Sequence, residues 1–334
     1  MKRIVYLFVA LLMMATADAQ TLTERQKGLA ACACLMAQGD MNRLEPTVRM
    51  ALNKGVTINE LKEAFSQLYA YTGFPRSLNA LGVLSKVLEN KQPEWQEGKP
   101  WKRPAEWDDA KKAYELGVKN QTQLSGKPFN YEFCPQDDYY LKSHLFGDIF
   151  AGDQLSAADR EIVTVAALSG LDGVAPQLAA HKQGAVNMGN SKQQVDELCT
   201  WLCNEGYTLN TKWPKGEPNP YGKYFIGQSY LADVGGGVMN VTFEPCCRNN
   251  WHIHHKQVQV LICIAGRGWY QEWGKAPVEM TPGTVIAVPA EVKHWHGAQK
   301  DSWFQHLTYH KDVQEGAGNE WCEPVDDATY NALK

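Results

Sequence analysis

The spacing of apolar side chains changes once along the chain. From Leu22 to about Asn90, and again from Tyr139 to about Gly206, apolar residues recur three and four positions apart, which is the period of an amphipathic helix. After residue 224 the period becomes that of strands, in short runs bounded by Gly and Pro: Met239–Phe243, Val258–Ala265, Gly268–Trp273, Thr284–Val288 and Trp303–Tyr309. The pattern predicts a multidomain chain with an all-α domain followed by an all-β sandwich or barrel.

The helical half contains an internal repeat. The segment TERQKGLAACACL, which begins at Thr23, aligns with SAADREIVTVAAL, which begins at Ser156, 133 residues later. A second block, ALNKG at Ala51, aligns with AVNMG at Ala185 after 134 residues. Each copy has the pattern of a few helices around a tight Gly turn. We expect the two copies to pack their apolar faces together into one all-α domain.

Changes in composition divide the chain further. A stretch rich in Pro, Trp, Lys and Glu separates the two helical units, with one helix expected near Trp107–Leu116. A loop rich in Pro, Gly, Lys and Asn separates the helices from the strands. The predicted order is a leader (1–19), unit 1 (20–90), a connector (91–139), unit 2 (140–206), a linker (207–224), the strand domain (225–312) and a C-terminal tail (313–334).

The first twenty residues have the layout of a secretory signal peptide. Lys2 and Arg3 precede the uncharged run Ile4–Met14, and Ala17-Asp18-Ala19 supplies small residues before a cleavage point at Gln20. The alternative is a buried N-terminal helix. Later segments lack eighteen consecutive apolar residues, so we expect an exported, periplasmic protein with no membrane partner after cleavage.

The charge distribution bears on the binding partners of the protein, and the cysteine content bears on its disulfides. The net charge of −4 over 334 residues is spread without long runs, which argues against nucleic acid as a partner. Nine cysteines would suit disulfides in an exported protein, but their number is odd and several lie in helical or apolar strand patterns. We expect most of them to be small buried hydrophobic residues, with one or two disulfides possible.

Histidine is the main chemical signal. Seven of the nine histidines lie between residues 252 and 310. His252 and His254 are two apart in a strand, so both side chains face the same side. Gln259 has odd spacing from His254 and shares that face only if the strand bends near His255-Lys256. Downstream, a Gly turn, a short strand and a Pro lead to His294, which returns toward the same interior.

These residues resemble the two motifs of the cupin family. The first motif is carried by His252-Ile253-His254 with Gln259 where Glu is usual, and by Gly266. The second is carried by Gly283, Pro289 and His294, with Glu291 in place of an inner Gly and Ala298 in place of a trailing Asn. The resemblance implies a cupin barrel, a double-stranded β-helix or jelly roll, that binds one divalent transition metal ion (Fe, Mn, Ni, Cu or Zn) through His252, His254, Gln259 and His294. A metal-free barrel lined by histidines is the alternative.

Four other histidines accompany the motifs. His296 follows His294 on the same face and is a candidate proton donor or a support for the ligands. His306 is expected to line the same cavity, whereas His255 and His310 are expected at the surface. Trp295, Trp269 and Trp303 are expected in the core or the cavity wall.

The helical half resembles the carboxymuconolactone decarboxylase family. Unit 2 carries its pattern in Arg160-Glu161, Leu168, His181, Ala185, Asn187, Gly189 and Glu197. The resemblance implies that His181 lies near a substrate lactone as a proton-transfer group, with Arg160 and Glu161 as further catalytic candidates and a homo-oligomer formed through this domain. His181 as a structural residue, and Arg160 paired with Glu161 or Asp159 at the surface, are the alternatives. Unit 1 has Thr47, Lys27 and Gly28 at the matching positions.

Three functional hypotheses follow. The first is an exported bifunctional enzyme that acts on a small cyclic or aromatic-derived acid or lactone. The second is a non-catalytic cupin that binds a small molecule or metal, with a helical oligomerisation domain. The third is peroxide reduction of the alkylhydroperoxidase type, which normally needs a C-x-x-C pair, whereas this chain has Cys32-Ala33-Cys34.

Overall fold

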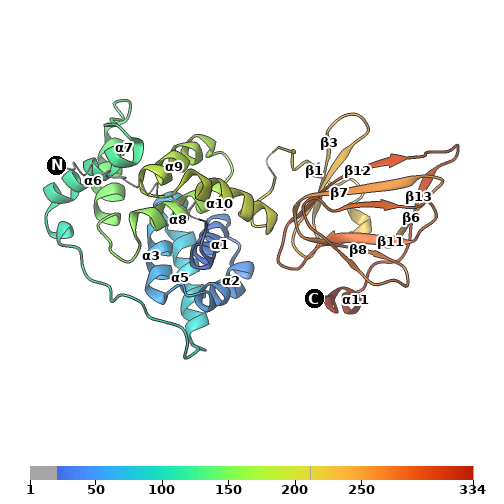
Figure 1. Cartoon of the computed structure of the whole chain (residues 1–334), viewed down its shortest axis with the longest axis horizontal. Coiled ribbons are helices and arrows are strands. Elements are labelled where there is room, and N and C mark those ends of the chain that lie inside the picture. The colour runs from blue at the N-terminus through green and yellow to red at the C-terminus, as the bar shows by residue number, and fades with distance from the viewer. Residues whose placement is uncertain (1–20, 211, 334) are drawn as a thin grey trace, which may run out of the picture.

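The computed structural model describes residues 21–210 and 212–333 and contains a helical half and a strand half (Figure 1). The predicted combination of an all-α domain with an all-β cupin barrel is therefore confirmed. The predicted signal peptide at residues 1–19 lies outside the described residues. None of the described helices has the length and apolar character needed to cross a membrane.

The internal repeat is visible in the helix boundaries. In unit 1, α1, α2 and α3 span Glu24–Gln38, Met41–Asn53 and Ile58–Gln67, followed by α4 (Tyr69–Thr72) and α5 (Phe74–Leu88). In unit 2, α8, α9 and α10 span Ala157–Ser169, Ala175–Asn187 and Lys192–Asn204. The caps repeat too: hydroxyls cap α1 and α3 in unit 1 and α8 and α10 in unit 2, through Thr23, Thr57, Ser156 and Ser191.

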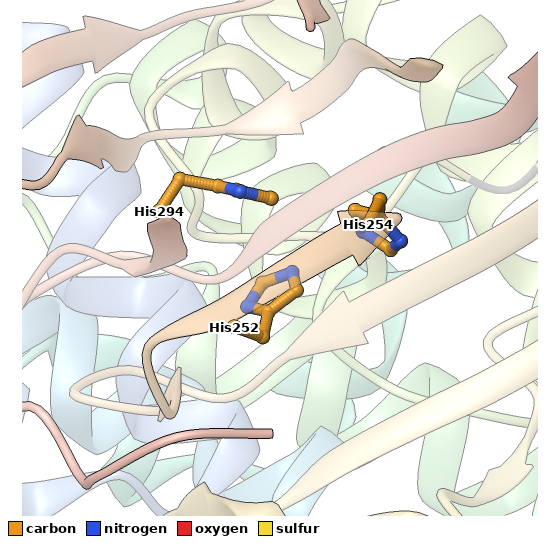
Figure 2. Close-up of side chains that lie close together, drawn as sticks. All are labelled: His252, His254 and His294. Carbon is orange, nitrogen blue, oxygen red and sulfur yellow. The ribbon is translucent and has the colours of Figure 1, made fainter. Parts of the chain in front are cut away.

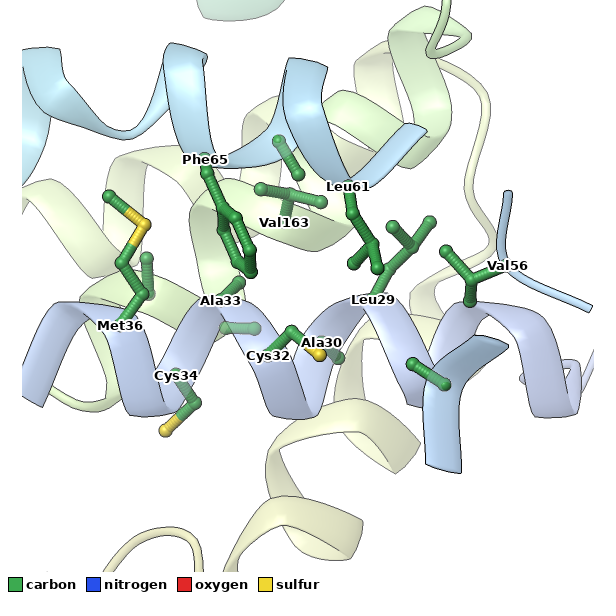
Figure 3. Close-up of a cluster of buried hydrophobic side chains, with 14 of the residues drawn as sticks. Leu29, Ala30, Cys32, Ala33, Cys34, Met36, Val56, Leu61, Phe65 and Val163 are labelled. Carbon is green, nitrogen blue, oxygen red and sulfur yellow. The ribbon is translucent and has the colours of Figure 1, made fainter. Parts of the chain in front are cut away.

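Helix α1 is the centre of the helical core (Figure 3). Residues Leu29 to Ala37 are all 0% exposed, so this helix is buried on every side. It packs against α8 and α2. A Cβ atom on Gly28 would lie 3.1 Å from Ala51 and from Val56, so glycine allows the close approach of α1 to its neighbours. Cys32 and Cys34 lie in this core as small buried residues.

The connector contributes to the helical domain. It contains η1 (Ala105–Asp108), α6 (Ala110–Ser125) and α7 (Pro135–Tyr140), and α7 runs into the π-helical segment η2 (Leu141–Ile149). The helix predicted near residues 107–116 is α6, which begins after its cap at Asp109 and runs nine residues further than expected, to Ser125. Gly117 allows α6 and η2 to touch, since a Cβ there would lie 1.6 Å from the carbonyl oxygen of Lys142.

The strand half consists of two antiparallel sheets. The first has the order β1-β3-β4-β12-β7-β10, with bounds Glu217–Pro218, Ser229–Asp233, Met239–Phe243, Phe304–Lys311, Val258–Gly266 and Val285–Val288. The second has the order β13-β6-β11-β5-β2, with bounds Gly318–Trp321, His252–His255, His294–Ala298, Arg248–Asn249 and Phe225–Ile226. β8 (Gly268–Glu272) pairs with β11 and with β9 (Val278–Met280).

Two short helices complete this half, η3 (Gly222–Tyr224) and α11 (Asp327–Asn331). The core includes Leu261, Tyr270, Met280 and the aromatic pair Phe243–Phe304. The sheets extend beyond the predicted boundary at residue 312, because β13 in the expected tail pairs with β6. β1 in the expected linker likewise pairs with β3.

The linker is fixed to the first sheet by hydrogen bonds. The Asn210 amide N–H donates to Gln305 Oε1 at 2.9 Å, and Asn240 Nδ2 donates to the Pro214 carbonyl at 2.7 Å. The helical half adds Arg43, whose Nη1 donates to the carbonyls of Gly206 and Asp301 at 2.9 and 3.1 Å. The two halves therefore contact each other through buried polar groups.

Candidate metal centre

Three of the predicted ligands, His252, His254 and His294, meet inside the barrel (Figure 2). Each offers a ring nitrogen, and these nitrogens all lie within 4.8 Å of one another. His252 and His254 project from β6, and His294 lies directly opposite His252 at the start of β11. All three are at most 2% exposed. Buried nitrogens this close together are typical of a transition-metal site.

Gln259 joins this group because the chain bends where the spacing required it. β6 ends at His255, and Lys256 adopts a left-handed conformation with φ 58° before β7 begins. The change of direction puts Gln259 on the same inner face as His254. Its Oε1 atom lies 3.0 Å from His294 Nε2. The structure thus brings all four predicted ligands together.

The hydrogen bonds of the three histidines determine which nitrogen is free. His252 Nδ1 bonds the Asn250 carbonyl at 3.0 Å, and His294 Nδ1 bonds the Val292 carbonyl at 2.9 Å. Because a carbonyl only accepts, each Nδ1 carries the proton and each Nε2 carries a lone pair. His254 Nε2 is buried and has no hydrogen-bond partner among the described residues. Metal-bound histidines usually have this arrangement, with the second ring nitrogen anchored by an oxygen.

Burial also keeps these rings uncharged. Removal from water lowers the pKa of His254 and of His294 to about 4, and the pKa of His252 falls well below its usual value for the same reason. Neutral imidazoles bind metal without first releasing a proton. The donor set of three neutral imidazoles and an amide oxygen therefore fits a divalent transition metal ion.

Two more buried histidines lie beside this group, His296 with its ring 5.6 Å from that of His252. His296 and His306 are 3% and 0% exposed, and their rings are 4.8 Å apart. Asn249 Nδ2 donates to His296 Nε2 at 3.0 Å, whereas His306 Nε2 has no partner within the described chain. Burial lowers the pKa of His306 to about 4. The Thr308 hydroxyl, two residues along β12, is also buried without a partner in the described part of the protein.

The outer histidines differ from each other. His255 lies between Glu291 and Glu320, and its position near the surface agrees with expectation. His310 is exposed, as expected, and its Nε2 lies 3.3 Å from His254 Nδ1. Asn319 and Trp321, which the sequence analysis missed, also contact the site: Asn319 Oδ1 is 2.6 Å from His254 Nδ1, and the Trp321 ring is 5.0 Å from that of His252. The only sequence signal for them is a four-residue strand pattern in the tail.

The helical half contains a separate buried polar pair. His181 Nδ1 lies 2.8 Å from Glu161 Oε2, and Glu161 is fully buried. The other carboxylate oxygen, Glu161 Oε1, has no partner among the described residues, and neither does the hydroxyl of Tyr71, whose ring packs edge-on against His181. The resemblance pointed to His181 and Glu161, and the structure places them in direct contact.

The alternative that pairs Arg160 with Glu161 or Asp159 at the surface is wrong. The side chain is 1% exposed, and its guanidinium bonds Glu63 at 2.7 Å, Gln67 at 2.8 Å and the Gly152 carbonyl at 3.0 Å. Asp159 pairs with Arg25 instead. With these contacts Arg160 joins the two repeat units and has little capacity left for a substrate carboxylate.

The cysteines of α1 do not suit peroxide chemistry. Burial raises the pKa of Cys34 to about 12 and raises that of Cys32 as well, so neither thiol ionises near neutral pH. All nine cysteines fall in the described part of the chain and are free thiols there, with Cys32, Cys34, Cys247 and Cys263 buried.

Comparison with known proteins agrees with the predicted family of each half. The sequence profile of the carboxymuconolactone decarboxylase family matches residues 4–86 and 139–208. The profile of the cupin domain matches residues 239–304. The chain joins a carboxymuconolactone decarboxylase family domain to a cupin domain. The family match in the first half covers both repeat units and leaves out most of the connector.

Among curated proteins, the chain is similar to an (R)-mandelonitrile lyase of Granulicella tundricola, with 41% identity over 91 residues, 27% of this chain and 68% of that protein. It is 42% identical over 61 residues to Peroxisomal protein 2 of Saccharomyces cerevisiae, of which it spans only 21%. Among solved structures, a cupin-like protein from Thermotoga maritima is 30% identical and covers 36% of this chain and 94% of its own, with a TM-score of 0.34. The two domains and the lyase relative support a lyase-like enzyme for small molecules.

Proposed function

We propose that the cupin half is a metal-dependent lyase that cleaves a cyanohydrin, an α-hydroxynitrile, into an aldehyde and hydrogen cyanide. The observation that carries the proposal is the buried donor set of three histidines and Gln259, in a chain that is 41% identical to an (R)-mandelonitrile lyase over 68% of that enzyme. The lyase likeness supports the class of reaction, and the ligand set would supply the metal ion for it.

In the proposed reaction, four residues would bind the metal and a fifth would accept a proton. His252, His254, Gln259 and His294 would hold the metal ion, which when bound would act as a Lewis acid toward the substrate hydroxyl oxygen. His306 Nε2 is buried and unpartnered in the described structure, so it is the proposed acceptor of the hydroxyl proton. As that proton leaves, the carbon–carbon bond to the nitrile breaks, the carbonyl forms, and the cyanide takes up a proton.

Aromatic side chains near the ligands support an aryl substrate. The ring of Tyr270 lies 5.8 Å from that of His294, and Trp321 lies beside His252 and stacks on Tyr224 at 4.6 Å. Flat apolar surfaces of this kind bind aromatic rings well. The neighbouring Thr308 hydroxyl is a buried polar group that a substrate hydroxyl or nitrile can satisfy.

We propose a second activity for the helical half, which makes the protein bifunctional. The Glu161–His181 pair is the acid–base group, and a small cyclic or aromatic-derived acid or lactone is the substrate class. The carboxylate orients the imidazole, and the free ring nitrogen of His181 is left to exchange a proton with the substrate. Loss of lactone turnover in His181→Ala, with folding retained, would support this part of the proposal.

Export to the periplasm and homo-oligomerisation through the helical half also belong to the proposal. Large exposed side chains on that half favour an oligomer, among them Phe74 at 60% exposure and Leu78 at 62%. Cell fractionation tests export, and light scattering of the purified protein tests the oligomer. A monomer at micromolar concentration, or a protein found only in the cytoplasm, contradicts the respective part.

The experiment for the cupin activity is cyanide release from racemic mandelonitrile. The purified protein is reconstituted separately with Mn, Fe, Ni, Cu and Zn, and each form is compared with the same form of His306→Gln. We expect release with at least one metal, preference for one enantiomer, and a rate at least tenfold lower in the variant. No release above the uncatalysed rate with any metal contradicts the proposal.

A further inference from the structure

The metal-binding strand has a neighbour that comes from outside the matched cupin segment. β13, at Gly318–Trp321, pairs antiparallel with β6, and its register sets Asn319 opposite His254 and Trp321 opposite His252. The profile match ends at residue 304, so this strand lies outside the matched segment. Side chains directly opposite each other on paired strands share a face, which brings Asn319 to His254.

A chain of hydrogen bonds fixes the orientation of the Asn319 amide. Gln257 Nε2 donates to the Gly318 carbonyl at 3.3 Å, and the same amide group donates to Asn319 Oδ1 at 3.0 Å. The carbonyl determines which end of the Gln257 amide is the donor. That donor in turn requires an acceptor, the oxygen of Asn319, to face it.

The same oxygen then determines the protonation of His254. Asn319 Oδ1 lies 2.6 Å from His254 Nδ1. Since the amide oxygen only accepts, the proton of the neutral imidazole stays on Nδ1 and the lone pair stays on Nε2, the buried nitrogen without a hydrogen-bond partner among the described residues. His254 is thereby held in the one tautomer that can bind a metal from inside the barrel.

The other two histidine ligands do not depend on a distant segment. His252 and His294 each bond the backbone carbonyl two residues before them, Asn250 and Val292. His254 instead depends on a side chain 65 residues away. His310 Nε2, at 3.3 Å from the same Nδ1, is the nearest alternative partner.

We infer that Asn319, held by Gln257, is a positioning residue that sets the tautomer of His254 and thereby the affinity of the cupin site for its metal. This inference rests on the metal site of the proposed function. Partners of this kind usually change metal affinity by about 10–100-fold. β13 therefore contributes to the metal site, although its own side chains do not bind the ion.

The test compares Asn319→Leu, which keeps the size and removes the acceptor, with Asn319→Asp, which keeps the acceptor. Glu320→Gln on the same strand is the matched control, because Glu320 bonds the outer His255 and not a ligand. Cobalt(II) affinity is measured by competition with a chelator. Exchangeable ring N–H signals are recorded by proton NMR of the cobalt(II) forms, in which each ligand histidine bound through Nε2 gives one shifted Nδ1–H signal.

We expect three such signals in the wild type, in Asn319→Asp and in Glu320→Gln. In Asn319→Leu we expect cobalt binding about 10–100-fold weaker and loss of one signal through tautomer change or rapid exchange. Should Asn319→Leu fail to fold, Asn319→Ala takes its place, since the residue is exposed at the edge of the sheet. If the leucine variant, or the alanine variant in its place, binds cobalt as tightly as wild type and keeps three signals, the positioning role is wrong although the metal site stands. If the wild type binds no cobalt, the proposed function and the inference both fail.

Discussion

The Oε1 atom of Gln259 lies 3.0 Å from the Nε2 atom of His294, and both atoms carry lone pairs. The neutral His294 ring carries its proton on Nδ1, which donates to the Val292 carbonyl. Its Nε2 atom therefore has no proton to donate to the amide oxygen. Two acceptors at this distance repel each other unless a cation lies against both. A cation bound to both atoms would remove this repulsion, so the contact fits Gln259 as the fourth ligand.

Replacement of Gln259 tests this explanation. Gln259→Leu removes one metal ligand, so we expect metal binding at least tenfold weaker. Gln259→Glu replaces the amide ligand with a charged carboxylate and should bind metal at least as tightly as wild type. Competition with a chelator measures both. Gln299→Leu is the control, because Gln299 bonds Glu279 at the surface away from the site. Equal affinity of Gln259→Leu and Gln299→Leu would remove Gln259 from the ligand set.

The buried histidines predict how the metal-free protein responds to acid. The pKa of His306, and of the ligands His254 and His294, is lowered from 6.5 to about 4. Between these pH values the unfolded chain binds protons that the folded chain excludes. Stability is therefore highest above pH 6.5 and falls as the pH drops toward 4, by about 1.4 kcal/mol per pH unit for each such histidine.

Urea unfolding of the metal-free protein at several pH values measures this dependence. His306→Leu removes one of the titrating groups and should make the decline shallower. A variant at the outer His255, whose pKa its two carboxylate partners raise, should not make it shallower. The same slope in wild type and His306→Leu would show that His306 is not buried in its neutral form.

Arg160 is expected to matter for stability and not for the cupin reaction. Arg160→Ala leaves the carboxylate of Glu63 and the amide of Gln67 without their buried partner, so the free energy of unfolding should fall by about 3–5 kcal/mol. The exposed pair of Arg103 and Asp108 gives the comparison, since Arg103→Ala should cost no more than about 1 kcal/mol. Similar losses from the two substitutions would contradict the structural role of Arg160.

The pair in the helical half should act independently of the cupin. His181→Leu leaves the Glu161 carboxylate buried without a partner, which should cost about 1–3 kcal/mol, and the double replacement Glu161→Leu with His181→Leu should recover part of that loss. Cyanide release by the cupin should stay within about twofold of wild type in both. A large fall in cyanide release would instead mean that the two halves form one catalytic unit.

The sequence predicted the features that depend on local pattern. The helical repeat follows from the spacing of apolar residues, and the predicted equivalence of α1 with α8 is confirmed. The motif histidines follow from strand alternation. Even the bend before Gln259 was required by an odd spacing, and it occurs at Lys256.

The features that the sequence did not predict depend on contacts between distant segments. The residues that flank Arg160 in the sequence show only a helical pattern and do not indicate its partners. The packing of α8 against unit 1 brings Glu63 and Gln67 to it. Asn319 lies in a segment with weak strand pattern, because an edge strand needs only one partner and few apolar residues. Such strand pairing depends on contacts that form only when the whole barrel folds.

The metal content of the purified protein tests the central claim most directly. Wild type, His252→Ala and His255→Ala are produced together, and metal per chain is measured by elemental mass spectrometry after dialysis. We predict close to one transition-metal ion per chain in wild type and in His255→Ala, whose side chain lies outside the ligand group, and nearly none in His252→Ala. Equally low metal in wild type and His252→Ala would contradict the account.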